Sequence, residues 1–355
     1  MTDISPCADF SPAHNPHVRV FSDGSFFYNL RELLAPALQN HFGVPAINCR
    51  SRHIVIAVLT AAWEEKSPII LEIAESEQKY CNMPPERLAD MVHAEVNAMI
   101  ERYGYHVPVC LHMDHVQKDL TLIDRAITAG FSSVEADLSK LPLAENIAKS
   151  REVVKKAHSF GVSVELEEGE IGATSALVDP NIDANIESYY TKAEDAARLA
   201  KEGGADAIAI FVGNGHGQYL KEPKIGFDRI REVASAAGIP VVLHGGSGLK
   251  PEVFRRAIEC GAAKFNYATS VSDVLFENLP AEFLGHMDAK AKELNTARRK
   301  VLYLFEEKID ALPAEILSKA RKAMEDHVRM MMREAFLSVG QAKFYEKKAA
   351  MAACH

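Results

Sequence analysis

Eight short apolar runs, each followed by a stretch with helical periodicity, constrain the fold of this chain more than any other feature. The runs are continuous rather than alternating, which is typical of parallel strands covered on both faces. Eight successive strand–helix units predict an α/β fold, a (β/α)8 TIM barrel. A doubly wound open sheet is less favoured because no GxGxxG turn follows the first run. The predicted strands are 44–48, 68–73, 107–113, 133–137, 162–167, 207–212, 240–243 and 263–267.

The segments outside these units predict additions to a barrel rather than a second domain. Residues 1–26 lack periodicity, and 27–42 have the apolar spacing of an amphipathic helix that could cap the closed end of the barrel. Beyond the last unit, long helical patterns are followed by a basic, frayed end, and such additions often serve subunit contacts. We predict a single domain, 1–355, with an arm and capping helix (1–43), a barrel (44–275) and a helical extension (276–355).

Composition limits the partners and the compartment. The 355 residues are 48% hydrophobic and 25% charged, as in a globular protein with a sizeable core. The formal net charge of −9 gives no general attraction for nucleic acid or an anionic membrane, so local donors must hold any anionic substrate. The six cysteines form no CxxC pair, and we find neither a signal peptide nor a membrane-spanning run. We therefore expect a soluble, cytoplasmic protein.

Three predicted strands end in a histidine, and this pattern indicates a metal site. His115, His216 and His244 follow the third, sixth and seventh strands, where a barrel gathers its functional residues. Any one of them could be a hydrogen-bonded structural histidine, but three at strand ends are harder to explain in that way. Three neutral imidazoles with one open position are typical of catalytic zinc.

Asp114 precedes the first of these histidines and has a free carboxylate. Beside a divalent cation it should stay ionised, so it could act as a base towards a substrate hydroxyl. The alternative is that Asp114 only orients an imidazole. His112, two residues before Asp114, is better suited to hydrogen-bond a metal ligand than to bind the metal itself.

A glycine-rich turn after the seventh strand predicts a phosphate site. The sequence GGSG at 245–248 precedes Lys250 and a helix, while Asn266 and Thr269 follow the eighth strand. Backbone amides of glycine turns and helix N-termini bind phosphate, and barrels often place it after these two strands. A tight turn without a ligand is the alternative.

Carboxylates also end the fourth and fifth strands. They could hold a second cation, hydrogen-bond the histidines, or form a solvated loop, and these interpretations stay open. The long segment 168–190 that follows has the character of a lid. The acids in question are Asp137, Glu165, Glu167, Glu168 and Glu170.

Together these residues resemble the class II, metal-dependent fructose-bisphosphate aldolase family, which includes tagatose-bisphosphate aldolases. The resemblance runs from about residue 44 to 342 and is strongest over 107–270. The matching pieces are PAIN (45–48), LHMDH (111–115), AGFSSV (129–134), LPLAENI (141–147), VSVE (162–165), HGQY (216–219), LHGGSG (243–248) and KFN (264–266).

The resemblance implies a (β/α)8 barrel, usually a homodimer or homotetramer, that acts on a sugar phosphate. It implies Zn²⁺ on the three histidines, leaves room for a monovalent cation, and makes Asp114 the acid/base on the hydroxyl of the bond that is cleaved. Asp137 and Glu167 match an alternative metal site in relatives. The residues implied around the substrate and its phosphate are Asn48, Gly217, Gly245, Ser247, Asn266 and Thr269.

The chain departs from the family at sugar-contacting positions. Relatives often have an acidic lid motif where this chain has GATSA at 172–176, and polar residues where it has Ala74 and Ala268. Either another acid replaces the lid acid, or the proton at the enolising carbon is moved in a different way. The candidates are Glu168, Glu170, Asp179 and Asp183.

We therefore predict a zinc-dependent lyase that reversibly cleaves a phosphorylated ketose, resembling a ketose 1,6-bisphosphate, into dihydroxyacetone phosphate and an aldehyde. Alternatives are a non-catalytic, sugar-phosphate-binding companion subunit and a family member acting on another carbonyl compound. A zinc hydrolase of the amidohydrolase type would need His-x-His at the first strand, where this chain has Asn48-Cys-Arg.

Overall fold

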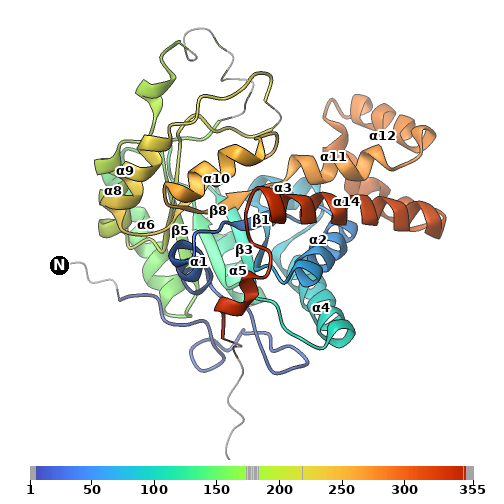
Figure 1. Cartoon of the computed structure of the whole chain (residues 1–355), viewed down its shortest axis with the longest axis horizontal. Helices are drawn as coiled ribbons and strands as arrows, with labels where there is room; N and C mark the ends of the chain where they lie inside the picture. Colours follow the sequence, from blue (N-terminus) through green and yellow to red (C-terminus); the bar gives the residue numbers. More distant parts are fainter. Residues whose placement is uncertain are drawn as a thin grey trace, which may run out of the picture.

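A closed barrel of eight parallel strands forms the centre of the molecule (Figure 1). The computed structural model describes residues 5–172, 174, 177, 179, 182, 184–217, 219–346 and 348. Each strand pairs with the next in the chain, and the eighth pairs with the first, so no edge is left open. The strands are β1 (Val44–Asn48), β2 (Ile69–Ala74), β3 (Val109–Val116), β4 (Ser133–Ala136), β5 (Ser163–Glu168), β6 (Ala207–Ile210), β7 (Val241–Leu243) and β8 (Ala262–Asn266).

Helices surround the barrel and continue beyond it. The predicted (β/α)8 barrel is confirmed, with element bounds shifted by a few residues. Several elements outside the eight units were predicted only as helical regions, and α3 was not predicted. The helices are α1 (Leu30–Gln39), α2 (Arg52–Glu65), α3 (Glu75–Tyr80), α4 (Pro85–Tyr103), α5 (Thr121–Ala129), α6 (Leu143–His158), α8 (Ala193–Gly203), α9 (Phe227–Ala237), α10 (Pro251–Glu259), α11 (Thr269–Glu277), α12 (Ala281–Glu293), α13 (Glu306–Asp310) and α14 (Ala314–Glu334), with 3-10 turns η2 (Ile186–Tyr189), η3 (Arg298–Phe305) and η4 (Gln341–Phe344).

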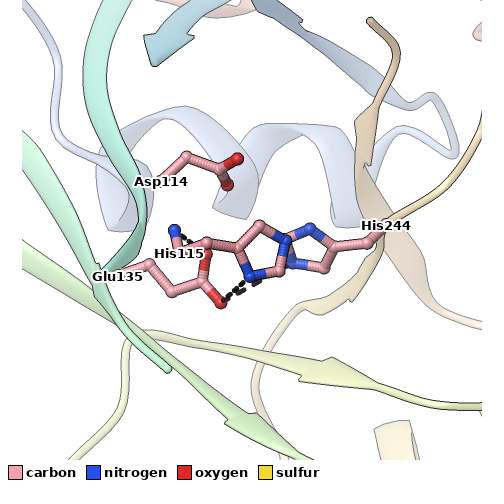
Figure 2. Close-up of side chains that lie close together, drawn as sticks. All are labelled: Asp114, His115, Glu135 and His244. Atoms are coloured by element: carbon pink, nitrogen blue, oxygen red, sulfur yellow. Dashed lines mark hydrogen bonds and ion pairs between the residues drawn. The ribbon is translucent and has the colours of Figure 1, made fainter. Parts of the chain in front are cut away.

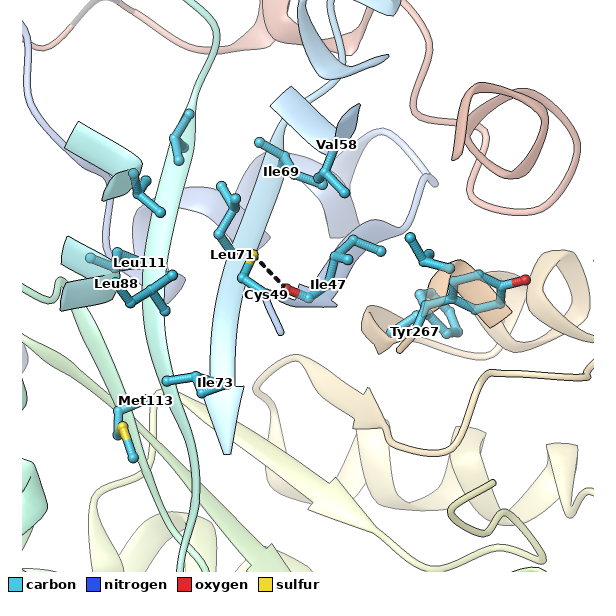
Figure 3. Packing of buried hydrophobic residues seen from close by; sticks show 14 of the residues in the cluster. Ile47, Cys49, Val58, Ile69, Leu71, Ile73, Leu88, Leu111, Met113 and Tyr267 are labelled. Atoms are coloured by element: carbon cyan, nitrogen blue, oxygen red, sulfur yellow. Dashed lines mark hydrogen bonds between the residues drawn. The ribbon is translucent and has the colours of Figure 1, made fainter. Parts of the chain in front are cut away.

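Apolar side chains fill the space between strands and helices. Figure 3 shows Leu71 and Leu111 of neighbouring strands beside Val58 of α2 and Leu88 of α4, all fully buried. Burying each such side chain contributes about 1.5–3 kcal/mol. This packing fixes the strands and therefore the position of every side chain at their carboxyl ends.

Helix α1 closes the amino-terminal end of the barrel, as predicted. It is shorter than the predicted 27–42 at both ends. A capping box fixes its start after Asn29: the Asn29 side chain accepts from the Glu32 amide (3.0 Å), and Glu32 accepts from the Asn29 amide (2.8 Å). Its buried Leu33 and Leu34 pack into one cluster with Ala46 of β1. The site must therefore lie at the opposite end.

The prediction of a frayed carboxyl end is wrong for the described residues after α14. The Tyr345 hydroxyl donates to the Leu33 carbonyl (2.7 Å), and Lys348 forms an ion pair with Glu32. These contacts join the end of the chain to α1.

In Figure 1, α11, α12 and α14 extend to one side of the barrel. No described helix is both long and apolar enough to cross a membrane. Assignment of 1–355 to a single domain stays a prediction.

Candidate active site

Strand β3 positions Asp114 and His115 by breaking its regular geometry. The register with β4 shifts between Met113 and Val116, and His115 has a left-handed backbone with φ +47°. That conformation is uncommon for a residue with a side chain and persists where the surroundings enforce it. Here Glu135 accepts a hydrogen bond from the His115 amide at 2.8 Å. The bulge turns the His115 side chain towards the other histidines.

The three predicted metal ligands come together at the carboxyl end of the barrel. The ring centroid of His115 lies 4.2 Å from that of His244 and 4.9 Å from that of His216, and the latter two are 6.1 Å apart. Figure 2 shows the His115 and His244 rings side by side with Glu135 close to both. The structure therefore brings together side chains from β3, the loop after β6 and the end of β7.

Carboxylates determine which ring nitrogen of two histidines is free. His115 Nδ1 lies 3.0 Å from Asp137 Oδ2, and His244 Nε2 lies 3.0 Å from Glu165 Oε1. The remaining nitrogens, His115 Nε2 and His244 Nδ1, are buried without a hydrogen-bond partner. Buried polar atoms rarely stay unpaired, and metal-bound histidines usually donate their second nitrogen to a carboxylate. These residues fit a divalent metal ion.

The acids after β4 and β5 are part of this arrangement. Asp137, Glu165 and Glu167 are buried, so the interpretation of a solvated loop is wrong for them. Asp137 and Glu165 instead hydrogen-bond the histidines, which was one of the predicted alternatives. Asp137, Glu167 and Glu135 also surround His115 closely enough to share a cation with it. Glu135, on β4, was not predicted.

Asp114 lies beside the histidines and is held by two amides. Its Oδ1 accepts from Asn266 Nδ2 at 2.9 Å, and its Oδ2 lies 3.4 Å from Asn48 Nδ2. Burial opposes ionisation, but the positive charges of His115 and Lys264 hold the pKa of Asp114 below its usual range. An ionised, oriented carboxylate of this kind can accept a proton from a substrate hydroxyl.

The predicted phosphate-binding residues line a cavity of about 560 Å³ that Asp114 and His216 also line. Gly245 has φ +69°, and a β-carbon there would lie 2.2 Å from the Gly215 carbonyl oxygen, so only glycine fits. Ser247 Oγ accepts from the Ala268 amide (3.1 Å), which joins this loop to the start of α11. The other predicted phosphate-binding residues that line the cavity are Gly217, Asn266 and Thr269.

The described part of the lid segment contacts the histidine loop. The Gly172 carbonyl accepts from the His216 amide (2.9 Å), and the Thr174 amide donates to the His216 carbonyl (3.0 Å). Burial raises the pKa of Glu168 to about 7, but neither Glu168 nor Glu170 lines the cavity. The other two candidate lid acids are Asp179, which does not line it either, and Asp183, which lies outside the described residues.

The same cavity is also lined by a group of cations that was not predicted. The buried Arg50 forms an ion pair with Glu77 at 2.5 Å, and Arg299 and Lys300 come from the 3-10 turn η3 of the helical extension. The extension, which had no functional interpretation from sequence, therefore contributes to the site. The cavity-lining cations are Arg50, Lys79, Lys118, Arg299 and Lys300.

Comparison with known proteins decides the family. The profile of the family described as "Fructose-bisphosphate aldolase class-II" matches residues 28–341. The chain belongs to this family. It is a class II aldolase and hence a lyase, as predicted, in a family that acts on sugar phosphates and is typically metal-dependent.

Curated relatives and a solved structure agree with this assignment. The aldolase is 33% identical to the fructose-bisphosphate aldolase of Geobacillus stearothermophilus over 295 residues, 83% of this chain and 96% of the relative. It is 37% identical to the 6-phospho-5-dehydro-2-deoxy-D-gluconate aldolase of Bacillus licheniformis over 249 residues, 68% and 79% of the two chains. The YdjI aldolase from Escherichia coli K12 superposes with a TM-score of 0.68 and 26% identity, covering 88% of this chain and 98% of that one.

Proposed function

We propose that this aldolase reversibly cleaves a phosphorylated ketose, resembling a ketose 1,6-bisphosphate, into dihydroxyacetone phosphate and an aldehyde. The observation that carries the proposal is the pair of unpartnered, buried nitrogens on His115 and His244, next to the carboxylate of Asp114. Together with His216, they would hold Zn²⁺. The bound ion would supply the positive charge that stabilises the enediolate formed on bond cleavage.

The protein's own groups supply the remaining steps. In the cleavage direction Asp114 takes the proton of the C4 hydroxyl, and the C3–C4 bond breaks. Asn266 and Asn48 keep the carboxylate in place through their amide groups. The backbone around Gly245 and the start of α11 at Thr269 would hold the phosphate of dihydroxyacetone phosphate.

The cavity-lining cations support a substrate with a second anionic group. None of the described ion pairs includes Lys79, Lys118, Arg299 or Lys300, so no carboxylate among the described residues neutralises their charge. Lys300 Nζ lies over the ring of Tyr80, which also lines the cavity, 5.5 Å from its centroid. A phosphate or a carboxylate on the aldehyde fragment would suit them, and the names of the two curated relatives include one substrate of each kind.

The free buried thiols of Cys49 and Cys110 support the cytoplasmic location that we include in the proposal. The proposal also includes assembly of the aldolase as a homodimer or homotetramer.

The proposal is tested by stripping the protein of metal, restoring zinc and measuring release of dihydroxyacetone phosphate. The panel pairs each ketose 1,6-bisphosphate with the corresponding ketose 1-phosphate and adds a ketose phosphate that ends in a carboxylate. We expect zinc-dependent release, fastest from a sugar with a second anion. No release from any sugar, despite stoichiometric zinc binding, would contradict the proposal.

A paired variant tests the assignment of the second anion. Arg299→Ala/Lys300→Ala should raise KM for substrates with a second anion and leave KM for ketose 1-phosphates unchanged. Lys308→Ala is the control, because Lys308 lies on the same extension, stacked on Phe305 outside the cavity. Equal KM changes for both substrate types would contradict the assignment.

A further inference from the structure

Lys264 is a completely buried cation for which the proposed reaction has no use. It lies on β8 between Ala263 and Phe265, has no exposed surface, and does not line the cavity. Taking an ammonium group out of water costs several kcal/mol, and a protein recovers that cost only through well-placed partners. The partners of Lys264 therefore indicate what the residue does.

The partners of Lys264 are carboxylates of the barrel interior and His112, whose Nε2 lies 3.4 Å from Lys264 Nζ. Its Nζ lies 2.8 Å from Glu165 Oε2, 3.5 Å from Glu72 Oε2 and 3.9 Å from Asp114 Oδ1. The contact with Glu165 is a direct, charge-assisted hydrogen bond, and the other two are longer ion pairs. Glu165 is thus the group that Lys264 orients most strongly.

Glu165 connects Lys264 to a proposed metal ligand. Its Oε2 accepts from Lys264, and its Oε1 lies 3.0 Å from His244 Nε2. A carboxylate whose first oxygen is fixed by an ammonium group offers its second oxygen as an acceptor, so His244 Nε2 must carry the proton. His244 Nδ1 then has a free lone pair, and it is the nitrogen that the structure leaves buried and unpartnered.

We propose that Lys264 is a positioning residue that, through Glu165, holds His244 in the tautomer that binds metal through Nδ1. This inference rests on the proposed metal site. Without the ammonium group, Glu165 would lose its hydrogen-bonded counter-charge and no longer hold the Nε2 proton of His244 in one orientation. A purely structural role, in which Lys264 only balances buried carboxylates, predicts lower stability without a change in metal binding.

The test measures zinc affinity directly, by competition with a chromophoric chelator, for the parent, Lys264→Met, Glu165→Gln and the double variant. Loss of a residue that orients a metal ligand typically weakens metal binding about 10–100-fold, and we expect that loss in each single variant. The double variant should lose little more than the larger single effect, because both changes interrupt the same path. The absorption bands of the Co²⁺-substituted protein should shift in the same variants.

Ser163→Ala is the matched control. Ser163 is buried on β5, the strand that carries Glu165, and its Oγ accepts a hydrogen bond from the Leu30 amide (2.8 Å) and donates one to the Ser132 carbonyl (3.4 Å). These contacts include neither Lys264 nor His244, so zinc affinity should not change. Folding is checked by circular dichroism and thermal melting of the metal-free proteins. If Lys264→Met does not fold, Lys264→Gln and the nearly isosteric Glu165→Gln carry the test.

Two outcomes separate this inference from the proposed function. Parental zinc affinity in a folded, neutral variant at position 264, or in Glu165→Gln, would overturn the role of Lys264 while the proposed function stands. Failure of the parent protein to bind zinc at all would instead contradict the proposed metal site and the inference with it.

Discussion

The side-chain amide of Asn266 donates a hydrogen bond to Oδ1 of Asp114, with 2.9 Å between nitrogen and oxygen. The contact joins the end of β8 to the end of β3 across the barrel mouth. It fixes the direction of the carboxylate of Asp114, whose pKa nearby positive charges hold below its usual range against the effect of burial, within the same cavity as the proposed phosphate and metal sites. The geometry of the catalytic base is therefore set before any substrate arrives.

Replacement of Asp114 by asparagine should remove the base and preserve its shape. A positioned general base contributes about 10²–10⁴-fold to a rate, so we expect kcat for cleavage to fall by that factor. Zinc affinity should stay close to that of the parent, since the three proposed ligands remain. Asp119→Asn is the control, because Asp119 is an exposed acid in the loop after β3 that accepts hydrogen bonds from Thr121. A D114N protein with parental kcat would contradict the assigned role.

Gly245→Ala tests the proposed phosphate loop. The added methyl group would lie 2.2 Å from the Gly215 carbonyl oxygen, so the loops after β6 and β7 must move apart. Gly238→Ala is the matched control: Gly238 also has a positive φ (+72°), but a β-carbon there meets nothing within 4 Å. The control should cost about 1–2 kcal/mol of unfolding free energy. Gly245→Ala should cost more and also raise KM, and equal effects of the two changes would show that crowding at Gly245 is unimportant.

His158 should make the attachment of the N-terminal arm depend on pH. Its Nε2 lies 2.9 Å from Asp206 Oδ2, and its Nδ1 lies 2.9 Å from the Ser5 carbonyl oxygen. Burial lowers the pKa of His158, but the hydrogen bond and charge of Asp206 outweigh it, and the net pKa is raised. A raised folded-state pKa means that the stabilisation is complete below the unfolded value of about 6.5 and is lost as pH rises through the folded value.

The measurement is the free energy of unfolding in urea for the parent and His158→Gln, at about pH 5.5 and about pH 8.5. Hydrogen bonds to charged groups contribute about 1.5–3 kcal/mol, so the variant should be less stable by that amount at the lower pH and by less at the higher pH. His14→Gln, a change in the same arm at a residue that hydrogen-bonds Ser11, controls for loss of a histidine. A difference that grew with pH would contradict the account.

Sequence was sufficient to predict the barrel, since each strand is a local apolar run and closure follows from eight repeats. The meeting of His115, His216 and His244 followed from the same topology, because the carboxyl ends of all strands lie on one face of a barrel. Glu135 and Lys264 were missed, although a signal existed. Each is an ionisable residue flanked by apolar neighbours in a buried strand, where a charge needs a partner.

Other features had no local signal. The left-handed backbone at His115 depends on Glu135, which is 20 positions away in the sequence. The ordered carboxyl end depends on contacts of Tyr345 and Lys348 with α1, more than 300 positions earlier. Neither hydrophobic periodicity nor residue type reveals such long-range contacts, so the basic carboxyl-terminal stretch was predicted to be frayed.

The most direct test of the central claim needs only dihydroxyacetone phosphate and no aldehyde. A site that forms the enediolate should exchange one hydrogen of dihydroxyacetone phosphate for deuterium in D₂O, which nuclear magnetic resonance detects. We predict exchange by the zinc-loaded protein and none by the metal-stripped protein, with exchange restored when zinc is added back. A protein that binds stoichiometric zinc and dihydroxyacetone phosphate yet exchanges no hydrogen would contradict the proposal that this site forms the enediolate of that compound.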